Sequence, residues 1–132
     1  MTRILALDWG EKRIGIAYSE GIIASPYTVI TRTRKKDDYA KIAKFVGQTE
    51  AELLIIGLPC TFDSDHPIGH QAKRILKHKR ALEHVLSIPI KLVDERFSTI
   101  DAKILLRHKG KKRKPAIDAI AAVVILQSFL HN

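Results

Sequence analysis

Residues 4–18 read ILALDWGEKRIGIAY, and the predicted topology follows from how this stretch begins. Its first four residues are uniformly apolar, as expected of a strand that is buried on both faces. They run up to Asp8 and a short turn around Gly10, after which residues 13–18 predict a second strand. A third strand is expected over residues 22–30. The chain therefore opens with an antiparallel meander, whereas a dinucleotide-binding fold would open strand–helix–strand.

Helices and strands alternate along the rest of the chain. Apolar, β-compatible segments predict buried strands over residues 53–57 and 90–93. Asp37 or Asp38 is expected to cap the helix that follows the meander. The predicted helices lie over residues 37–46, 69–86, 98–106 and 115–129. The predicted fold class is α/β: a mixed five-stranded sheet, with an antiparallel meander of three strands and then parallel strands, and helices on both faces.

The composition indicates a single domain, residues 1–132, with a strong positive charge. Lys and Arg number 23 against 14 for Asp and Glu, which gives a formal net charge of +9. Such an excess attracts polyanions and raises the rate of encounter with them. Cys60 is the only cysteine, so no disulfide can form within the chain. No signal peptide or membrane-spanning stretch is recognisable, and we expect a cytosolic protein.

Acidic residues stand at positions typical of a site. Asp8 and the pair Asp94–Glu95 directly follow predicted strands, where the crevice of an α/β sheet opens. Asp118 interrupts the apolar face of the last predicted helix, and a carboxylate there needs a positive partner. Carboxylates without a nearby His or Cys suit Mg²⁺ or Mn²⁺. Two such ions about 3.5–4 Å apart support phosphodiester hydrolysis.

Each of these carboxylates also has an explanation that involves no metal. Asp118 is predicted in the first turn of its helix, where an acidic side chain interacts favourably with the helix dipole. Asp8 is of a type common at turns. Asp94 or Glu95 would pair with Arg96 at the surface. The residues alone leave these alternatives open.

Four motifs carry a resemblance to a known family. They are residues 5–17, residues 55–59, the segment Asp-Glu-Arg-Phe-Ser-Thr at 94–99, and residues 117–127. In this order they resemble the YqgF/RuvX family, whose members are described as nucleases of pre-16S ribosomal RNA or resolvases of Holliday junctions. The motifs span nearly the whole chain, and the 94–99 segment is the most specific of them.

The resemblance implies a ribonuclease H-like domain with a catalytic and metal-binding trio at Asp8, Glu95 and Asp118. Asp94 is the competing neighbour of Glu95, because alternation along a strand lets only one of the two face the site. The family pattern favours Glu95. The chain departs from the family after Pro59, where Cys60 and Asp63-Ser64 replace a Leu and an Asp-Gly pair, so the role of the loop over residues 60–67 stays open.

The basic residues predict contacts with substrate phosphates. Such contacts position a nucleic acid without reading its sequence. The loop that precedes the last helix is especially basic, and it is predicted to be mobile before substrate binds. The candidate substrate-binding residues are Lys12, Arg13, Arg96, Lys111, Lys112 and Arg113.

The function implied is a metal-dependent endonuclease that hydrolyses phosphodiesters of a structured nucleic acid. The favoured substrate is the 5′ end of pre-16S rRNA, and a Holliday junction is the alternative. A second alternative is a non-catalytic factor that binds nucleic acid during ribosome assembly. The turn at Asp8 also resembles the first phosphate loop of sugar kinases and actin-like ATPases, but those proteins close two domains around the nucleotide. We expect a monomer or a weak homodimer, since symmetric cutting of a junction would require two copies.

Overall fold

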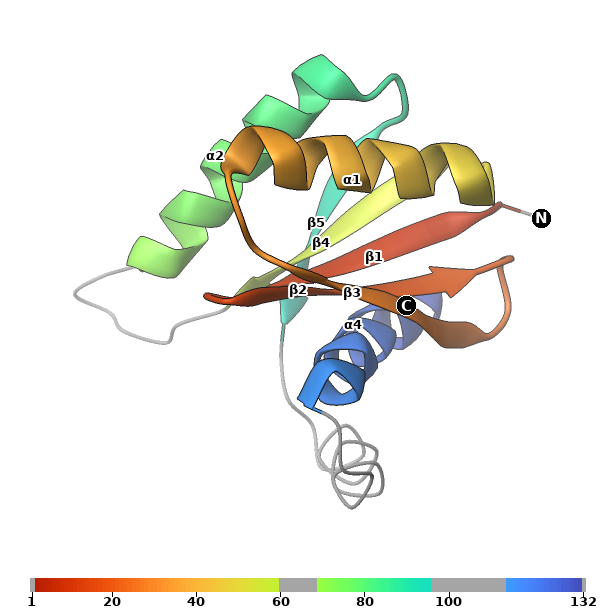
Figure 1. Cartoon of the computed structure of the whole chain (residues 1–132). Helices are drawn as coiled ribbons and strands as arrows, with labels where there is room; N and C mark the ends of the chain where they lie inside the picture. Colours follow the sequence, from red (N-terminus) through yellow and green to blue (C-terminus); the bar gives the residue numbers. More distant parts are fainter. Residues whose placement is uncertain (1, 60–68, 96–113, 132) are drawn as a thin grey trace.

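One mixed sheet organises the protein (Figure 1). The computed structural model describes residues 2–59, 69–95 and 114–131. The strands follow the order β3-β2-β1-β4-β5 across the sheet. Their bounds are β1 Ile4–Trp9, β2 Arg13–Ser19, β3 Ala24–Thr31, β4 Leu53–Pro59 and β5 Ile90–Glu95.

The strand directions confirm the predicted topology. β1 pairs antiparallel with β2, and β2 pairs antiparallel with β3. β4 pairs parallel with both β1 and β5. The strands are longer than their apolar runs, because β5 continues to pair with β4 as far as Glu95 opposite Pro59. Asp8 and Glu95 therefore lie in the last residues of strands, and not beyond them as predicted.

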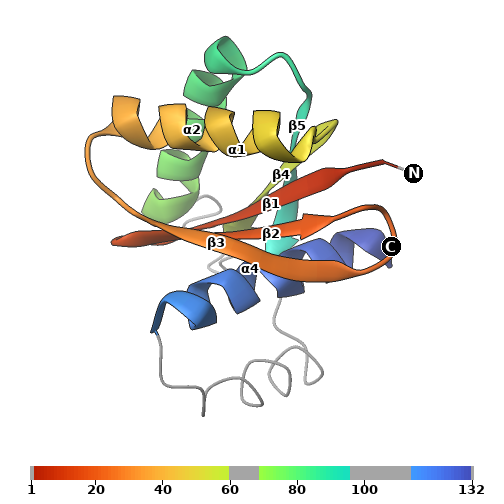
Figure 2. The ribbon, with the colours of Figure 1, turned by 45° about the vertical axis from the view of Figure 1, so that its right-hand side comes forward.

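The helices cover both faces of the sheet, as predicted. α1 (Lys35–Thr49) and α2 (His70–Val85) lie on one face, and α4 (Lys114–Leu130) lies on the other (Figures 1 and 2). Leu5, Leu7 and Trp9 of β1 belong to the buried cluster under α1 and α2, which we call the α1–α2 face. Ile4 and Ala6 belong to the cluster under α4, which we call the α4 face.

The start of α1 differs from the prediction. The N-cap position is Arg34, which makes no side-chain cap hydrogen bond, so neither Asp37 nor Asp38 is the cap. Asp38 lies inside the first turns of the helix and is 1% exposed. Its Oδ1 accepts hydrogen bonds from the backbone N–H (3.0 Å) and the hydroxyl (3.1 Å) of Thr33. A buried carboxylate needs hydrogen-bond donors around it, and Thr33 supplies two. These hydrogen bonds hold the segment before α1 against the first turn of the helix.

Other predicted elements lie outside the described residues. These are the loop over 60–67, the helix over 98–106 and the basic loop up to residue 113. Across the three described ranges, no helix combines the length and apolar character that crossing a membrane requires.

A buried aromatic–histidine cluster fills the α1–α2 face beneath the end of β1. The Trp9 and His78 rings stack with their centroids 4.1 Å apart and an angle of 13° between their planes. The Tyr39 hydroxyl lies 2.8 Å from His78 Nδ1, to which it donates when the neutral imidazole carries its proton on Nε2. Burial, followed by the nearby Arg32 and Lys35 charges, lowers the pKa of His78 to about 4. Sequence periodicity did not identify His78 as a core residue.

This burial predicts that acid destabilises the fold through His78. In the unfolded chain the imidazole binds its proton near pH 6.5, whereas in the folded protein its pKa is about 4. Between these values the unfolded state holds more protons, so stability is full above about pH 6.5 and falls as the pH is lowered toward 4, by about 1–3 kcal/mol. We expect His78→Phe to reduce the difference between urea unfolding free energies at pH 7.5 and pH 5. The control His84→Phe alters an exposed histidine of the same helix, and an equal reduction in that variant would contradict the assignment.

Candidate functional site

Strand alternation directs Asp8 toward α4. Ile4 and Ala6 pack in the cluster on the α4 face, and Asp8 follows them at the same two-residue spacing. Its neighbours Leu7 and Trp9 point to the opposite face. Asp8 is partly buried, and its pairing partner across the antiparallel ladder is Gly15 of β2.

The backbone of α4 rests directly on Gly15. A Cβ at residue 15 would lie 1.9 Å from the carbonyl oxygen of Asp118 and 3.0 Å from the backbone nitrogen of Ala119. Only a residue without a side chain leaves room for this contact. Because Gly15 is the partner of Asp8, the helix crosses the sheet at the level of Asp8. The fold therefore brings the backbone of Asp118 beside the strand end that carries Asp8.

A second glycine lies on the other flank of Asp8. The parallel register between β1 and β4 ends at Leu7 opposite Ile56, so Asp8 and Gly57 are the next residues of the two strands. Ile55 packs in the α4-face cluster, which puts Gly57 on that same face. Asp8 is thus flanked on the α4 face by two residues without side chains. On the side of Gly15 this space is taken by the backbone of α4.

Arg13 supplies the positive partner that Asp118 was predicted to need. Its Nε donates to Asp118 Oδ2 at 2.7 Å, with 32% and 28% of the two side chains exposed. The pair closes one side of an open pocket of about 310 Å³. The residues lining this pocket are Gly10, Glu11, Lys12, Arg13 and Asp118. Two carboxylates and two basic side chains therefore line a pocket at the rim of the sheet next to Asp8.

The helix-dipole explanation of Asp118 is wrong in its geometry. α4 begins at Lys114, so Asp118 lies in the second turn, and the first turn contains no acidic residue. The dipole acts mainly within the first turn of a helix. The contact with Arg13 and the position over Gly15 account for this carboxylate better than the helix terminus does.

Of the two neighbouring acids on β5, Asp94 lies on the wrong side of the sheet for a site with Asp8. Val93 packs against the α4-face cluster. Asp94 is exposed and pairs in register with Leu58, which packs on the α1–α2 face. Glu95 is the last residue of β5, and its side chain lies outside the described part of the structure. Among the described side chains no three acidic, histidine or cysteine residues gather closely enough to hold a metal.

The predicted phosphate-binding residues divide into two groups. Lys12 is exposed in the β1–β2 turn, and Arg13 begins β2. Both line the pocket beside Asp118. The other predicted contacts lie outside the described residues: Arg96, Lys111, Lys112 and Arg113.

Sequence analysis missed the residue that holds the β1–β2 turn from outside. Arg32 Nη1 donates to the backbone carbonyls of Gly10 (2.9 Å) and Glu11 (3.1 Å). Within the turn, the Gly10 N–H donates to the Arg13 carbonyl at 2.9 Å. No local pattern marks Arg32, because it meets the turn only through the pairing of β3 with β2.

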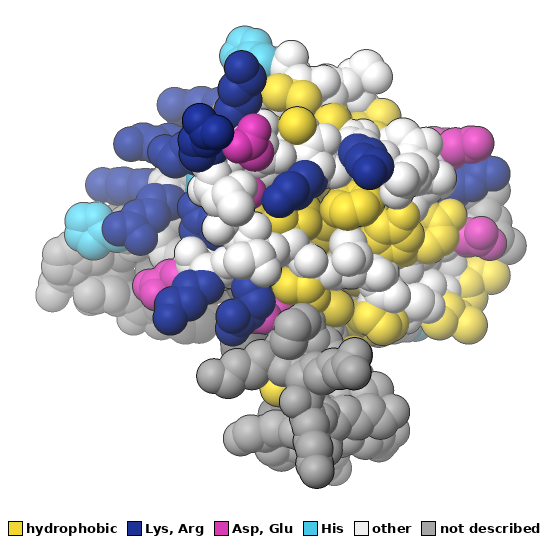
Figure 3. Space-filling view, viewed as in Figure 1, with side chains coloured by type: hydrophobic (Ala, Val, Ile, Leu, Met, Phe, Trp, Pro, Cys, Tyr) yellow, Lys and Arg dark blue, Asp and Glu magenta, His cyan; other side chains and the backbone are white. Residues whose placement is uncertain are grey.

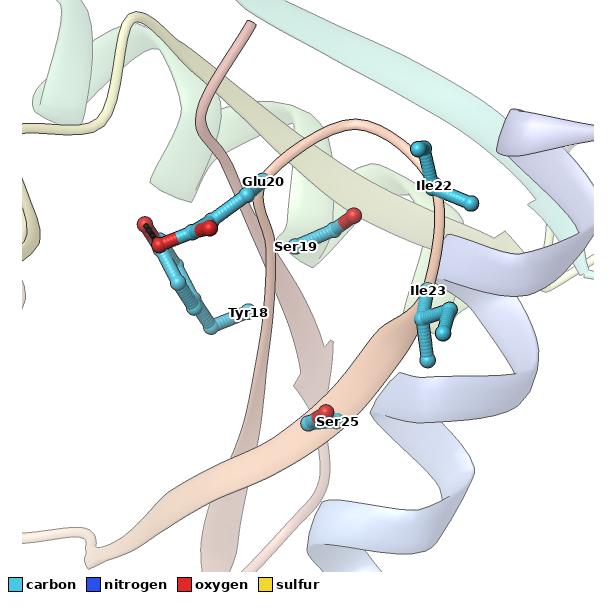
Figure 4. A pocket seen from close by; sticks show the side chains of 6 residues that line it. All are labelled: Tyr18, Ser19, Glu20, Ile22, Ile23 and Ser25. Atoms are coloured by element: carbon cyan, nitrogen blue, oxygen red, sulfur yellow. Dashed lines mark hydrogen bonds between the residues drawn. The ribbon is translucent and has the colours of Figure 1, made fainter. Parts of the chain in front are cut away.

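A hollow of similar size lies at the other end of the sheet, beside the hairpin between β2 and β3 (Figure 4). Ser19 in its wall pairs with Ile4, four residues before Asp8 in β1, which separates the two places by about 13 Å. The Tyr18 hydroxyl and Glu20 form a 3.5 Å hydrogen bond there, and Ile22 and Ile23 are exposed. Its lining contains one acidic residue, Glu20, and no basic residue, so the edge at Asp8 is the candidate site.

Comparisons with known proteins give relatives that match nearly the whole chain. A family model described as "RuvX: Holliday junction resolvase" matches residues 2–132. A protein of Rippkaea orientalis named "Putative pre-16S rRNA nuclease" is 41% identical over 97% of this chain and 94% of its own length. A protein of the same name from Thermoanaerobacter pseudethanolicus is 38% identical over 98% of this chain and 96% of its own length.

Solved structures show the same fold at low sequence identity. Thermus thermophilus RuvC in complex with a Holliday junction substrate superposes with a TM-score of 0.65 and 10% identity, over 99% of this chain and 96% of that one. The fowlpox virus resolvase, in complex with Holliday junction DNA, superposes with a TM-score of 0.60 and 10% identity, over 98% and 97%. The fold is therefore that of the RuvC-like, ribonuclease H-like resolvases, as predicted.

The contact between α4 and Gly15 makes a sharp mutational prediction. Gly15→Ala forces a methyl group against the Asp118 backbone, which cannot rotate away, and we expect a loss of about 3 kcal/mol of unfolding free energy. The control Gly47→Ala adds a methyl group inside α1, where nothing lies within 4 Å. That change removes the entropic cost of a helical glycine and should stabilise the fold by about 0.5–1 kcal/mol. Chemical denaturation of both variants checks the pair, and equal effects would mean that α4 does not rest on β2 as described.

Proposed function

The chain belongs to the RuvX family, and from this premise we propose that it is a metal-dependent endonuclease acting on structured nucleic acid. One observation carries the proposal: residues from opposite ends of the chain, Asp8 and Asp118, meet on the α4 face at the edge of the sheet. Family membership alone would also fit a protein that binds nucleic acid and has lost its chemistry. Two acidic residues at one edge of the sheet, beside a basic turn, favour an enzyme.

We assign Glu95 as the third carboxylate. Asp94 belongs to the α1–α2 face, and the alternation of a strand gives the following position to the α4 face, where Asp8 lies. The same assignment follows from the family resemblance of the 94–99 segment. Asp94 then has no part in the site.

The residues present fit a divalent cation. Asp8, Glu95 and Asp118 would provide oxygen ligands only, which Mg²⁺ and Mn²⁺ prefer, and a two-metal site is the proposed form. Asp8 lies next to Gly15, on which the backbone of Asp118 rests, so oxygen ligands from both ends of the chain are available at one edge of the sheet. The chemistry that such ions supply is the activation of water and the neutralisation of charge on the phosphate.

The protein's own residues orient this site and its substrate. Arg13 holds the Asp118 carboxylate through its Nε hydrogen bond, and this contact fixes the rotamer of a side chain that is about one quarter exposed. Lys12, exposed in the adjoining turn, is placed to contact a backbone phosphate beside the carboxylates. We propose the same role for Arg96, Lys111, Lys112 and Arg113. These contacts would position any phosphodiester backbone, so selection must come from substrate shape.

We propose the 5′ end of precursor 16S rRNA as the substrate. Relatives that share 36–41% identity with nearly the whole chain are named for that activity. The junction-bound RuvC is only 10% identical in sequence, so its similarity supports the fold and not the choice of substrate. The second candidate is a four-way DNA junction, because the matching family model is described by junction resolution.

The carboxylate assignments predict the activity of four variants. Asp8→Asn, Glu95→Gln and Asp118→Asn should each lose cleavage in Mg²⁺ or Mn²⁺ by at least about 100-fold, since each removes a charged ligand of the ions. Asp94→Asn, the matched control, removes an exposed carboxylate from the other face and should cleave like the wild-type protein. Single-turnover cleavage of a labelled substrate measures all four. A loss with Asp94→Asn and not with Glu95→Gln would move the site by one residue.

The choice of substrate is tested with one purified sample. Precursor 16S rRNA and a four-way DNA junction are offered separately, in equal concentrations and with the same divalent ion. We expect processing at the 5′ end of the RNA to be at least about tenfold faster, and to disappear in Asp8→Asn. Preferential cutting of the junction would establish the second candidate. Tight binding of RNA without metal-dependent cleavage of either substrate would favour a non-catalytic assembly factor.

A further inference from the structure

We infer that the protein has a second phosphate-binding site on the α1–α2 face, behind the β1–β2 turn, which takes a backbone phosphodiester away from the bond that is cut. The inference rests on the proposed function for the class of its ligand, a nucleic acid. It concerns a pocket to which neither the sequence motifs nor the catalytic carboxylates assign a role.

The pocket shares a wall with the candidate active site. Gly10 and Glu11 line both hollows, so the turn stands as a ridge between the α4 face and the α1–α2 face. The remaining lining is Trp9, Arg32, Gln71, Arg74, Ile75 and His78. Its cavity volume of about 30 Å³ has room for a water-sized group and none for a base or a sugar. The oxygens of a phosphate are groups of this size.

Trp9 indicates that the pocket lacks an acceptor. Its side chain is 4% exposed, and the buried Nε1–H has no hydrogen-bond partner among the described residues. A buried donor without a hydrogen-bond partner lowers the stability of the fold by about 1–3 kcal/mol, and such donors are rare in native proteins. His78 stacks face to face on the Trp9 ring, and its Nδ1 is paired with the Tyr39 hydroxyl, so it does not accept from this N–H. Trp9 also lines the pocket, and an anionic oxygen bound there is the acceptor that we propose for this N–H.

The charge of the lining favours an anion. Arg32 and Arg74 both line the pocket, against the single carboxylate of Glu11. Arg74 is exposed and forms no ion pair within the described residues. Arg32 uses Nη1 on the turn carbonyls and keeps further N–H groups of its guanidinium for a ligand. Arginine is suited to phosphate because its donors form a planar fork.

A basic surface extends from the pocket along the helices. α2 carries five Lys or Arg residues and one acidic residue, Glu83, which Lys79 pairs at 3.2 Å. Lys73, Lys77 and Arg80 are exposed on one row of this helix. Lys and Arg side chains gather over α2 and the beginning of α1 in the space-filling view (Figure 3). A backbone that is held at the pocket can therefore continue over α2.

Two phosphate sites on either side of one turn imply a substrate that bends across it. A straight duplex lying on the α4 face would not reach the α1–α2 face behind the ridge. A branched or folded nucleic acid can contact both, so the second site would select for shape without reading bases.

The single tryptophan of the chain offers a direct test of this pocket. We propose to follow its one indole N–H resonance by ¹H–¹⁵N NMR while a four-way DNA junction is added in the presence of EDTA. A phosphate oxygen that accepts from Nε1 should shift this resonance in the wild-type protein. Arg74→Gln should abolish the shift and weaken affinity roughly tenfold, as expected for one lost charge-assisted contact. In the same variant, the salt dependence of binding to this junction should flatten by about 0.9 in a log–log plot.

Lys44→Gln is the matched control, because it removes the same charge from an exposed position of α1 that lines neither pocket. It should keep the indole shift and most of the affinity. Equal effects of the two variants, or an indole resonance that never moves, would overturn the second site. Since EDTA suppresses cleavage, either result leaves the nuclease proposal intact. That proposal fails separately if the wild-type protein, supplied with Mg²⁺ or Mn²⁺, cleaves no substrate.

Discussion

The close approach of α4 to β2 at Gly15 is the contact on which the site depends. The carbonyl oxygen of Asp118 occupies the space that any side chain at residue 15 would fill, so the helix can approach the sheet to backbone distance. Because Gly15 pairs with Asp8, this one contact sets the height at which the helix crosses the strands. It thereby joins an N-terminal and a C-terminal carboxylate. The catalytic proposal, the Arg13 ion pair and the open pocket all follow from that crossing point.

Strand alternation places neighbouring residues on opposite faces of the sheet, where they have different roles. Asp8 faces α4 and the proposed chemistry, whereas Trp9 enters the buried cluster on the α1–α2 face and stacks on His78. The same alternation excludes Asp94 and supports Glu95 at the end of β5. A one-residue slip in either strand would exchange these roles, which is why the pairing register matters more here than the identity of any single acid.

Arginines keep the turn between the two faces in place. Arg32, which follows β3, donates to two backbone carbonyls of the turn. Arg13, which ends the turn, forms an ion pair with Asp118. Both arginines are partly buried and already form hydrogen bonds within the protein. A bound phosphate would share their charges with these partners. The excess of positive charge in the composition is thus of two kinds. Part of it builds the edge of the sheet, and part, on the exposed row of α2, remains for a polyanion.

The sequence by itself determined the element order, the meander and the faces of the helices, because these follow from local periodicity and from the turn at Gly10. The motifs also named Asp8 and Asp118 through resemblance, but no local pattern could show that they meet. Only the tertiary structure decided that Arg13 pairs with Asp118, that Arg32 holds the turn, and that His78 is buried against Trp9. It also moved Asp118 into the second turn of α4 and replaced the predicted cap of α1. These contacts join residues that are distant along the chain, and their geometry is set by strand register and by the space that glycine leaves, neither of which periodicity encodes.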